Sequence, residues 1–502
     1  MLFAILAGVA ALMLLPGLLL GPSLDAAVFT HAAGELGNGA ALYADVWDHK
    51  PPGVYLLLAG PQLALFFVNA WWVSWVLSVL ATAGAGTALA IACRRMGASP
   101  EATLVASIAG VVAMSQYLLA LGGGLTEPFA TLPVAVALVM VLKPGAAWSP
   151  RQLAVIGLLL SVAVLTSLQL IPGALGVTGI LLARLPRSGR LPAGAWIVGA
   201  GLVPVVAIVA WLVATGAFGA AVDALVGYSA AYRALRGDAD QAGSTAVVTW
   251  TLLSLLFLIV PALLGAMTLA RRQPLDRVVL IACGGWIGLS ILLFVFQGRF
   301  YAHYAVPLAV PLALLASAGV DRLDEMLLNT SQQSRQAMIL APFAFAILVS
   351  LWGGVAAGRM EWLPIARDHD RSTAVAEVVR ELTDDGGRIW VWGNEPTLYL
   401  DADRRQATRY PYLYPIVTQG YATPEMIDAT IAALETDPPA LVIDAGSDTP
   451  GSAGFHHLII PRALATDGRD LDILDPLREY IDANYEYVDV VEGWVIYERV
   501  AP

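Results

Sequence analysis

Asp25 is the first acidic residue of the chain, and it follows the apolar run 2–20 almost directly. Ser23 and Asp25 are both residue types that cap helices, so we expect a helix that begins here and runs to about Leu36. An apolar face predicts that this helix lies along the membrane surface. A carboxylate at a helix start stays ionised, and it could take the proton of an incoming hydroxyl. A helix cap without a chemical role explains Asp25 equally well.

A second cluster of reactive side chains follows in the same segment. It comprises Asp45, Trp47, Asp48, His49, Lys50, Pro51 and Pro52. Lys50 is the only lysine predicted to lie outside the membrane in the first 358 residues. A cation held at the lipid–water boundary by two prolines could bind a lipid phosphate. The alternative is a lysine that merely snorkels to the interface.

Two further groups lie at the starts of later apolar runs. Glu127 begins one run, where it is either a plain first-turn acid or faces the same cavity as Asp25. The second group contains Arg299, Tyr301, His303 and Tyr304. Arg299 could bind a phosphate, and the aromatic side chains could stack on a sugar or form an interfacial belt.

The composition predicts which elements must position these residues. Of the 502 residues, 58% are hydrophobic and only 13% are charged, about half the charged share of a soluble domain. A spanning helix needs about 20 mainly apolar residues. Residues 53–67, which Pro61 interrupts, are expected near the membrane surface or as a re-entrant piece. Eleven spans are predicted, over residues 2–20, 69–92, 102–120, 126–142, 152–168, 171–184, 192–214, 246–269, 277–297, 305–320 and 338–357.

The basic residues predict the orientation. With the N-terminus in the cytoplasm, twelve basic residues before position 359 fall in inner loops and four in outer loops, as the positive-inside rule requires. The odd number of spans then places the C-terminus outside, together with long outer loops at 21–52 and about 218–245. No basic stripe indicates a nucleic-acid partner. Cys93 and Cys283 both lie in apolar runs, so no disulfide framework is expected.

We therefore expect two domains. Residues 1–358 form a transmembrane domain whose outer loop 21–52 carries the candidate site, and residues 359–502 form a small extracytoplasmic α/β domain. The expected strands and helices of the second domain are the strands 388–393 and 441–445, a hairpin over 485–499, and helices over 424–435 and 472–484.

These motifs resemble a known family. The pattern consists of Asp25, Tyr43, Asp45, the run Asp48-His49-Lys50-Pro51-Pro52, and Thr126-Glu127-Pro128. It is similar to bacterial membrane glycosyltransferases of the GT-C fold, in the branch of the protein O-mannosyltransferases and the lipid A aminoarabinose transferase. Further similar segments are Gly298–Tyr304, Trp392-Gly393-Asn394-Glu395-Pro396 and Tyr399. Two positions depart from the family: Ala26 stands where the O-mannosyltransferases carry Glu, and His49 stands where the aminoarabinose transferases carry Glu.

The resemblance implies a bacterial inner-membrane enzyme that uses a polyprenyl-phosphate-linked sugar as donor. The acceptor would be a hydroxyl of a lipid, glycan or protein at the outer face. Asp25 would act as the base or orient the acceptor, Lys50 would contact the donor phosphate, and Glu127 would be a second acid beside the site. From these roles we expect an inverting displacement in which Lys50, with Arg299, offsets the charge of the leaving phosphate.

Three other functions are compatible with an apolar chain of this kind. A transporter is disfavoured because no predicted span carries a charge near its middle. A non-catalytic envelope-assembly protein would be insensitive to changes at Asp25, and an oligosaccharide ligase or polymerase of another fold would be expected to use an outer Arg/His pair. No cofactor is certain. Outer acids such as Asp25, Asp48 and Glu127 could hold a divalent cation, but no ligand spacing demands one.

Overall fold

Apolar helices form most of the structure. The computed structural model describes residues 1–500 except 146, 235–238, 298–300, 329–330, 335–336, 338–339, 342–343, 346–347, 349–363 and 446–470. Six of its helices are long and apolar enough to cross a membrane, and further apolar helices are shorter. The predicted polytopic α-helical membrane protein is thereby confirmed. The predicted eleventh span, 338–357, falls mostly on residues outside the described ones.

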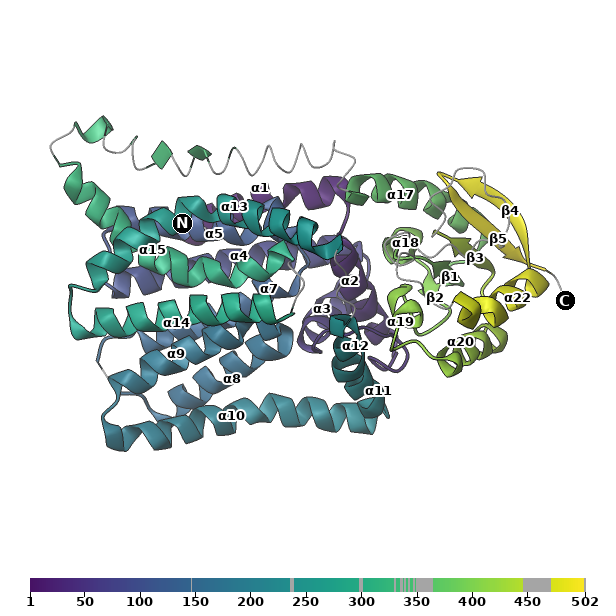
Figure 1. Cartoon of the computed structure of the whole chain (residues 1–502), viewed down its shortest axis with the longest axis horizontal. Helices are drawn as coiled ribbons and strands as arrows, with labels where there is room; N and C mark the ends of the chain where they lie inside the picture. Colours follow the sequence, from purple (N-terminus) through teal and green to yellow (C-terminus); the bar gives the residue numbers. More distant parts are fainter. Residues whose placement is uncertain are drawn as a thin grey trace.

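The other ten predicted spans all correspond to helices, which pack side by side in one bundle (Figure 1). Their bounds are α1 Leu2–Leu20, α4 Ala70–Arg95, α5 Pro100–Ser115, α7 Thr126–Val141, α8 Pro150–Thr166, α9 Ile171–Arg184, α10 Arg187–Ala214, α13 Ala239–Leu269, α14 Pro274–Gln297 and α15 Ala309–Met326. The predicted span 102–120 is interrupted, because Gln116 adopts an extended conformation between α5 and the short α6 (Tyr117–Ala120). The last span begins with the 3₁₀ turn η3 (Ala302–Leu308).

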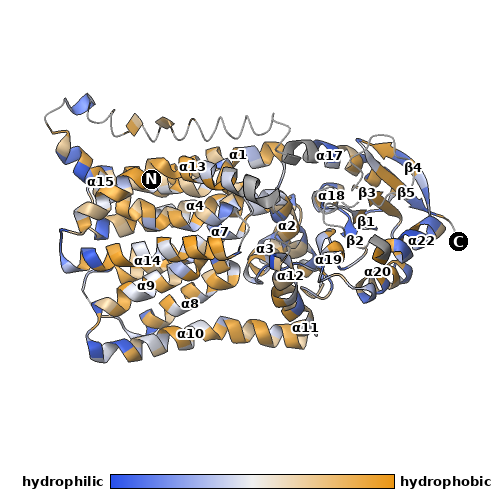
Figure 2. Cartoon of the chain, in the orientation of Figure 1, coloured by the Kyte–Doolittle hydropathy of each residue, from blue (hydrophilic) through white to orange (hydrophobic). Residues whose placement is uncertain are grey.

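Small residues bring neighbouring helices into contact. A Cβ atom on Gly265 of α13 would lie 1.9 Å from the carbonyl oxygen of Leu315, and one on Gly319 of α15 would lie 1.9 Å from that of Pro261. The two backbones therefore touch, which is how helices associate where lipid removes the hydrophobic driving force. Hydrophobic residues predominate along the helices of the bundle, and hydrophilic residues gather at the end remote from the sheet domain (Figure 2).

A layer of short helices separates the bundle from the C-terminal domain (Figure 1). It consists of α2 (Leu24–Gly37), α3 (Gly53–Ala64), α11 (Phe218–Val222), the π-helix η2 (Asp223–Tyr228) and α12 (Ser229–Ala234). The expectation for α2 was wrong in one respect. Nine of its 14 residues are buried, on all sides of the helix, because the C-terminal domain covers the side that was expected to face water. The predicted outer loop 218–245 is helical from residue 218 to 234.

The C-terminal domain contains a five-stranded sheet in the order β2-β1-β3-β5-β4. Strand β1 pairs in parallel with β2 and β3, whereas β5 pairs antiparallel with β3 and β4. The predicted strands and hairpin are confirmed as β1 (Arg388–Trp392), β3 (Leu441–Asp444), β4 (Tyr485–Val491) and β5 (Trp494–Arg499), and β2 (Arg405–Gln406) is an addition. The predicted helices correspond to α20 (Pro424–Thr436) and to η5 (Leu471–Leu474) with α22 (Asp475–Asn484). The domain also contains α17 (Pro364–Leu382), α18 (Thr397–Ala402) and α19 (Tyr414–Val417).

Candidate active site

Asp25 lies in the first turn of α2 without capping it. The side chain of Ser23 accepts a hydrogen bond from the Ala26 backbone N–H at 3.4 Å, so Ser23 is the cap. Asp25 itself is half-buried. The carboxylate is close to the positive end of the helix dipole. Because Ser23 already serves as the cap, helix capping does not account for Asp25.

The small residue that follows Asp25 is explained by packing. Gly124 has φ +79°, and a Cβ atom built on it would lie only 2.6 Å from the Cβ of Ala26. The start of α2 is therefore pressed against the Gly122–Gly124 turn, just before Glu127. A side chain at position 124 would collide with Ala26, so the close approach of α2 to this turn requires glycine there.

Lys50 lies among three carboxyl groups and the hydroxyl of Tyr304. Burial alone would lower the pKa of Lys50, but Tyr304, Asp25, Asp48 and Glu127 outweigh it and raise the pKa well above its ordinary range. The side chain is half-buried and carries its positive charge throughout the neutral pH range. Simple snorkelling needs no carboxylates around the lysine, so these surroundings favour a binding role for Lys50.

Glu127 and His303 complete this group. His303 is within electrostatic reach of Glu127, Asp25 and Lys50. Glu127 is 3% exposed, and its Oε2 atom has no hydrogen-bond partner among the described residues. An unpaired carboxylate oxygen is costly to bury, so a bound hydroxyl or cation would stabilise it. The start of α2, Lys50, the start of α7 and η3 thus lie within electrostatic reach of one another, which corresponds to one of the two alternatives stated for Glu127.

Asp48 holds the loop in place. It is 2% exposed, accepts a hydrogen bond from the Tyr412 hydroxyl at 2.7 Å and another from the Tyr55 hydroxyl, and pairs with Nδ1 of His49 at 3.1 Å. Burial alone would raise the pKa of Asp48, but His49 and the two hydroxyl donors lower it to about 2. Asp48 therefore ties the segment before Lys50 to α3 and to the C-terminal domain.

The backbone of the same loop is fixed at Tyr43. Its hydroxyl donates to the carbonyl oxygen of Lys50 at 2.8 Å, and its own carbonyl oxygen accepts from Nη2 of Arg409 at 2.7 Å. Tyr43 has φ +69°, an unusual conformation for a bulky residue. Contacts from the C-terminal domain therefore help to set the position of Lys50.

The remaining predicted residues lie partly beside this group and partly elsewhere. Asp45 is exposed and accepts a hydrogen bond from the Ala41 N–H at 2.7 Å, away from Asp25. The His49 ring lies 5.1 Å from that of Tyr228. Tyr301 stacks on His303 at 5.5 Å, and its hydroxyl lies 2.6 Å from that of Tyr232. Tyr304 contacts His303 edge-on at 4.6 Å, whereas Arg299 lies outside the described residues.

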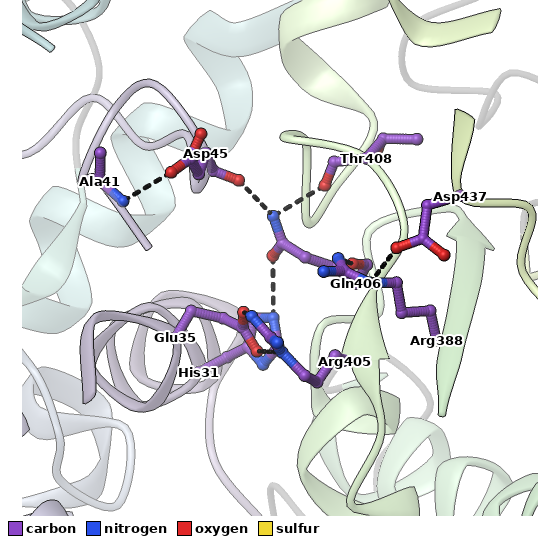
Figure 3. Close-up of polar contacts among 9 residues, drawn as sticks. All are labelled: His31, Glu35, Ala41, Asp45, Arg388, Arg405, Gln406, Thr408 and Asp437. Atoms are coloured by element: carbon purple, nitrogen blue, oxygen red, sulfur yellow. Dashed lines mark hydrogen bonds and ion pairs between the residues drawn. The ribbon is translucent and has the colours of Figure 1, made fainter. Parts of the chain in front are cut away.

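Sequence reasoning missed the contacts between α2 and the sheet domain, which Figure 3 shows in part. Glu35 accepts a bidentate pair of bonds from Arg405, with Nη2 to Oε2 at 2.7 Å. Nε2 of His31 is 2.8 Å from Oε1 of Gln406, and its ring stacks on Tyr399 at 4.7 Å. Burial lowers the pKa of His31, so it is neutral and donates this bond. His31 and Glu35 are four residues apart and share a helix face, but nothing in the sequence pattern indicates their distant partners.

A metal site is not evident. Within the ranges that the structure describes, no group of three or more His, Cys, Asp or Glu side chains could hold an ion. The hypothesis of a divalent cation therefore rests on Asp25 and Glu127 and stays a prediction.

Comparison with solved structures identifies the fold. The chain is similar to ArnT from Cupriavidus metallidurans in its apo state, with a TM-score of 0.59, 16% identity, and coverage of 96% of this chain and 94% of that one. The structure of ArnT bound to undecaprenyl phosphate gives 0.57 at 16% identity, covering 99% and 98%. The Archaeoglobus fulgidus oligosaccharyltransferase in complex with Zn and sulfate gives 0.49 at 13% identity, covering 88% and 67%. No family model and no curated protein matches the sequence. The chain thus has the GT-C type of fold, with helices and C-terminal domain matched together.

Proposed function

We propose that this protein transfers a sugar from a polyprenyl-phosphate donor to an acceptor hydroxyl at the outer face of the membrane. The observation that carries the proposal is the group formed by Asp25, Lys50 and Glu127, in which a charged lysine lies near carboxylates where the apolar bundle ends. A lipid donor with a phosphate head would place its tail along the bundle and its phosphate at Lys50. The fold neighbour ArnT, which was crystallised with undecaprenyl phosphate, supports this class of donor.

The proposed reaction is a single displacement. The acceptor O–H gives its proton to the Asp25 carboxylate, and the oxygen attacks the anomeric carbon. The bond between that carbon and the phosphate oxygen breaks, the electron pair leaves with the polyprenyl phosphate, and the configuration inverts. Lys50 stabilises the negative charge that develops on the phosphate. Asp25 supplies general-base catalysis, for which a half-buried carboxylate is suited.

Glu127 is proposed to position a reactant. Its buried Oε2 has no hydrogen-bond partner among the described residues, and it would accept a bond from a hydroxyl of the acceptor or of the donor sugar. A hydrogen bond from such a hydroxyl would remove the cost of the unpaired oxygen, so the empty site is destabilised relative to the occupied one. His303 lies within electrostatic reach of Glu127, Asp25 and Lys50 and borders the same group of residues.

The proposal is tested first by donor binding. The purified full-length protein in lipid nanodiscs is expected to bind undecaprenyl phosphate saturably and to release it from an undecaprenyl-phosphate sugar when an acceptor is present. Failure of the wild-type protein to bind undecaprenyl phosphate would contradict the proposal. The variants that localise the reaction are considered in the Discussion.

The C-terminal domain is expected outside the cytoplasm. It packs directly on the first outer loop, since Tyr412 bonds to Asp48, so both lie on one side of the membrane. Arg94, Arg95 and Arg184 close their helices at the other end of the bundle, as the positive-inside rule requires. Alkaline phosphatase fused after residue 502 should be active in a bacterial host, whereas a fusion after Arg95 should be inactive. If the C-terminal fusion is inactive and the fusion after Arg95 is active, the topology is the opposite of the one proposed.

A further inference from the structure

A cavity of about 470 Å³ lies between the first outer loop and the sheet domain. The end of α2 and the loop after it form one wall, and β1, β2, the segment after β2 and one side of α20 form the other. This volume falls within the range of about 300–1,000 Å³ that is usual for small-molecule sites. We call it the interdomain cleft. Figure 3 shows the polar side chains that meet there.

The lining of the interdomain cleft has polar and apolar surface in similar amounts, but it contains no large aliphatic side chain. Among the residues that line it there is no Leu, Ile, Val, Met, Phe or Trp. A polyprenyl tail would find no apolar wall here, so the cleft is not the site of the lipid donor. The hydrogen-bonding groups favour a ligand that both donates and accepts along its length.

The charges of the residues in the cleft indicate whether a phosphate or a neutral sugar is the better ligand. Arg388, Arg405 and Arg409 line the cleft, but Arg388 pairs with Asp437 at 2.6 Å and Arg405 pairs with Glu35 at 2.7 Å. Asp45 also lines the cleft and adds a third carboxylate against the three guanidinium groups. A site for a phosphate would have an excess of positive charge, whereas balanced acids and arginines suit the hydroxyl groups of a neutral sugar.

Hydrogen-bonding capacity remains in the cleft. The Nε atom of Arg409 is buried and has no partner within the described part of the chain. Asp45 uses one carboxylate oxygen for the Ala41 N–H, and an ionised carboxylate can accept several further bonds. By contrast, the Gln406 amide donates to the carbonyl oxygens of Asp45 and Thr408 and meets His31, so it is fully used.

We infer that the interdomain cleft binds neutral sugar residues of a glycan acceptor, at a distance from the hydroxyl that reacts. This inference rests on the proposed function. Asp25 and Glu35 are ten residues apart on α2, which corresponds to about 15 Å along the helix axis. A molecule that occupies the cleft and also reaches Asp25 must therefore be longer than one sugar, which selects an oligosaccharide or polysaccharide as acceptor.

Two tryptophan variants on α20 provide the test. Ala429 and Ala432 are both exposed on this helix, but only Ala429 lines the cleft. Ala429→Trp should therefore fill part of the cleft, and Ala432→Trp is the matched control. Binding of glucose, mannose and galactose tetrasaccharides is measured by saturation-transfer NMR on the full-length protein in nanodiscs, with inorganic phosphate and a hexapeptide mixture as competitors.

At least one tetrasaccharide should bind saturably to the wild type and to Ala432→Trp, and at least tenfold more weakly to Ala429→Trp. Undecaprenyl phosphate should bind all three proteins equally, which also shows that each is folded. The inference is overturned if no tetrasaccharide binds, if both variants bind like the wild type, or if peptide or phosphate displaces the sugar. A wild type that binds the sugar but not undecaprenyl phosphate contradicts the proposed function and leaves sugar binding at the cleft standing.

Discussion

Replacement of Asp25 by asparagine is expected to lower the rate of sugar transfer by about 10²–10⁴-fold, the usual contribution of a general base. Asparagine has nearly the same shape but cannot take the proton of the acceptor hydroxyl. The helix start should be unaffected, because Ser23 and not Asp25 caps α2. Binding of undecaprenyl phosphate, which depends on Lys50, should be retained.

The measurement is single-turnover release of polyprenyl phosphate from a labelled donor in nanodiscs. Glu101→Gln is the matched control, since Glu101 is also a first-turn acid, in α5, and is exposed. Both changes remove one negative charge from a helix N-terminus, so only a chemical role separates them. If Asp25→Asn transfers sugar at the wild-type rate, the role of Asp25 is purely structural.

Replacement of Lys50 by alanine is expected to weaken the binding of undecaprenyl phosphate by about 10–100-fold. A hydrogen bond to a charged group contributes about 1.5–3 kcal/mol, and each 1.4 kcal/mol corresponds to a factor of about 10 in affinity. Lys50→Arg should also lose affinity measurably, because a planar guanidinium does not fit a place shaped for a compact ammonium between Asp25, Glu127 and Tyr304.

Lys143→Ala is the control for the loss of a lysine charge, since Lys143 bonds to Gln152 at the opposite end of the bundle. Affinity is measured by titration of undecaprenyl phosphate into nanodisc-embedded protein. If Lys50→Ala and Lys50→Arg both bind like the wild type, Lys50 is an interfacial anchor, and Arg299 becomes the candidate for the phosphate.

The elements of the fold were predictable where their signal is local. The bundle helices follow from long apolar runs, and β3 (Leu441–Asp444) from a short run of apolar residues that is buried on both sides. Strand β2 (Arg405–Gln406) was missed because two residues are too few to show the alternation of apolar and polar residues that indicates a strand. The burial of α2 was missed because the sheet domain that covers it begins more than 300 residues later, and hydrophobic periodicity contains no information about such a distant partner.

The candidate site was likewise predictable only where the signal is local. Asp25, Lys50 and Glu127 were predicted from local context, and the structure brings them together. Asp48 was grouped with them because it stands two residues before Lys50, yet its carboxylate binds Tyr412, which is 364 residues away. Asp48 therefore contributes to the electrostatic surroundings of Lys50, as its place in the sequence suggested, and also binds a distant tyrosine that no local pattern indicates.

The contacts that fix the first outer loop have a consequence for biosynthesis. The partners of this loop are synthesised much later, about 370 residues after His31 and Glu35. They are Tyr399, Arg405, Gln406, Arg409 and Tyr412. At about 5–20 residues per second, the loop waits roughly 20–70 s after its own translation before the domain that holds it exists. The helices can insert in order during this time, but the residues around Lys50 acquire their final geometry only when the C-terminal domain folds against the loop. A chain interrupted during synthesis would thus be a membrane protein in which the surroundings of Lys50 are not formed.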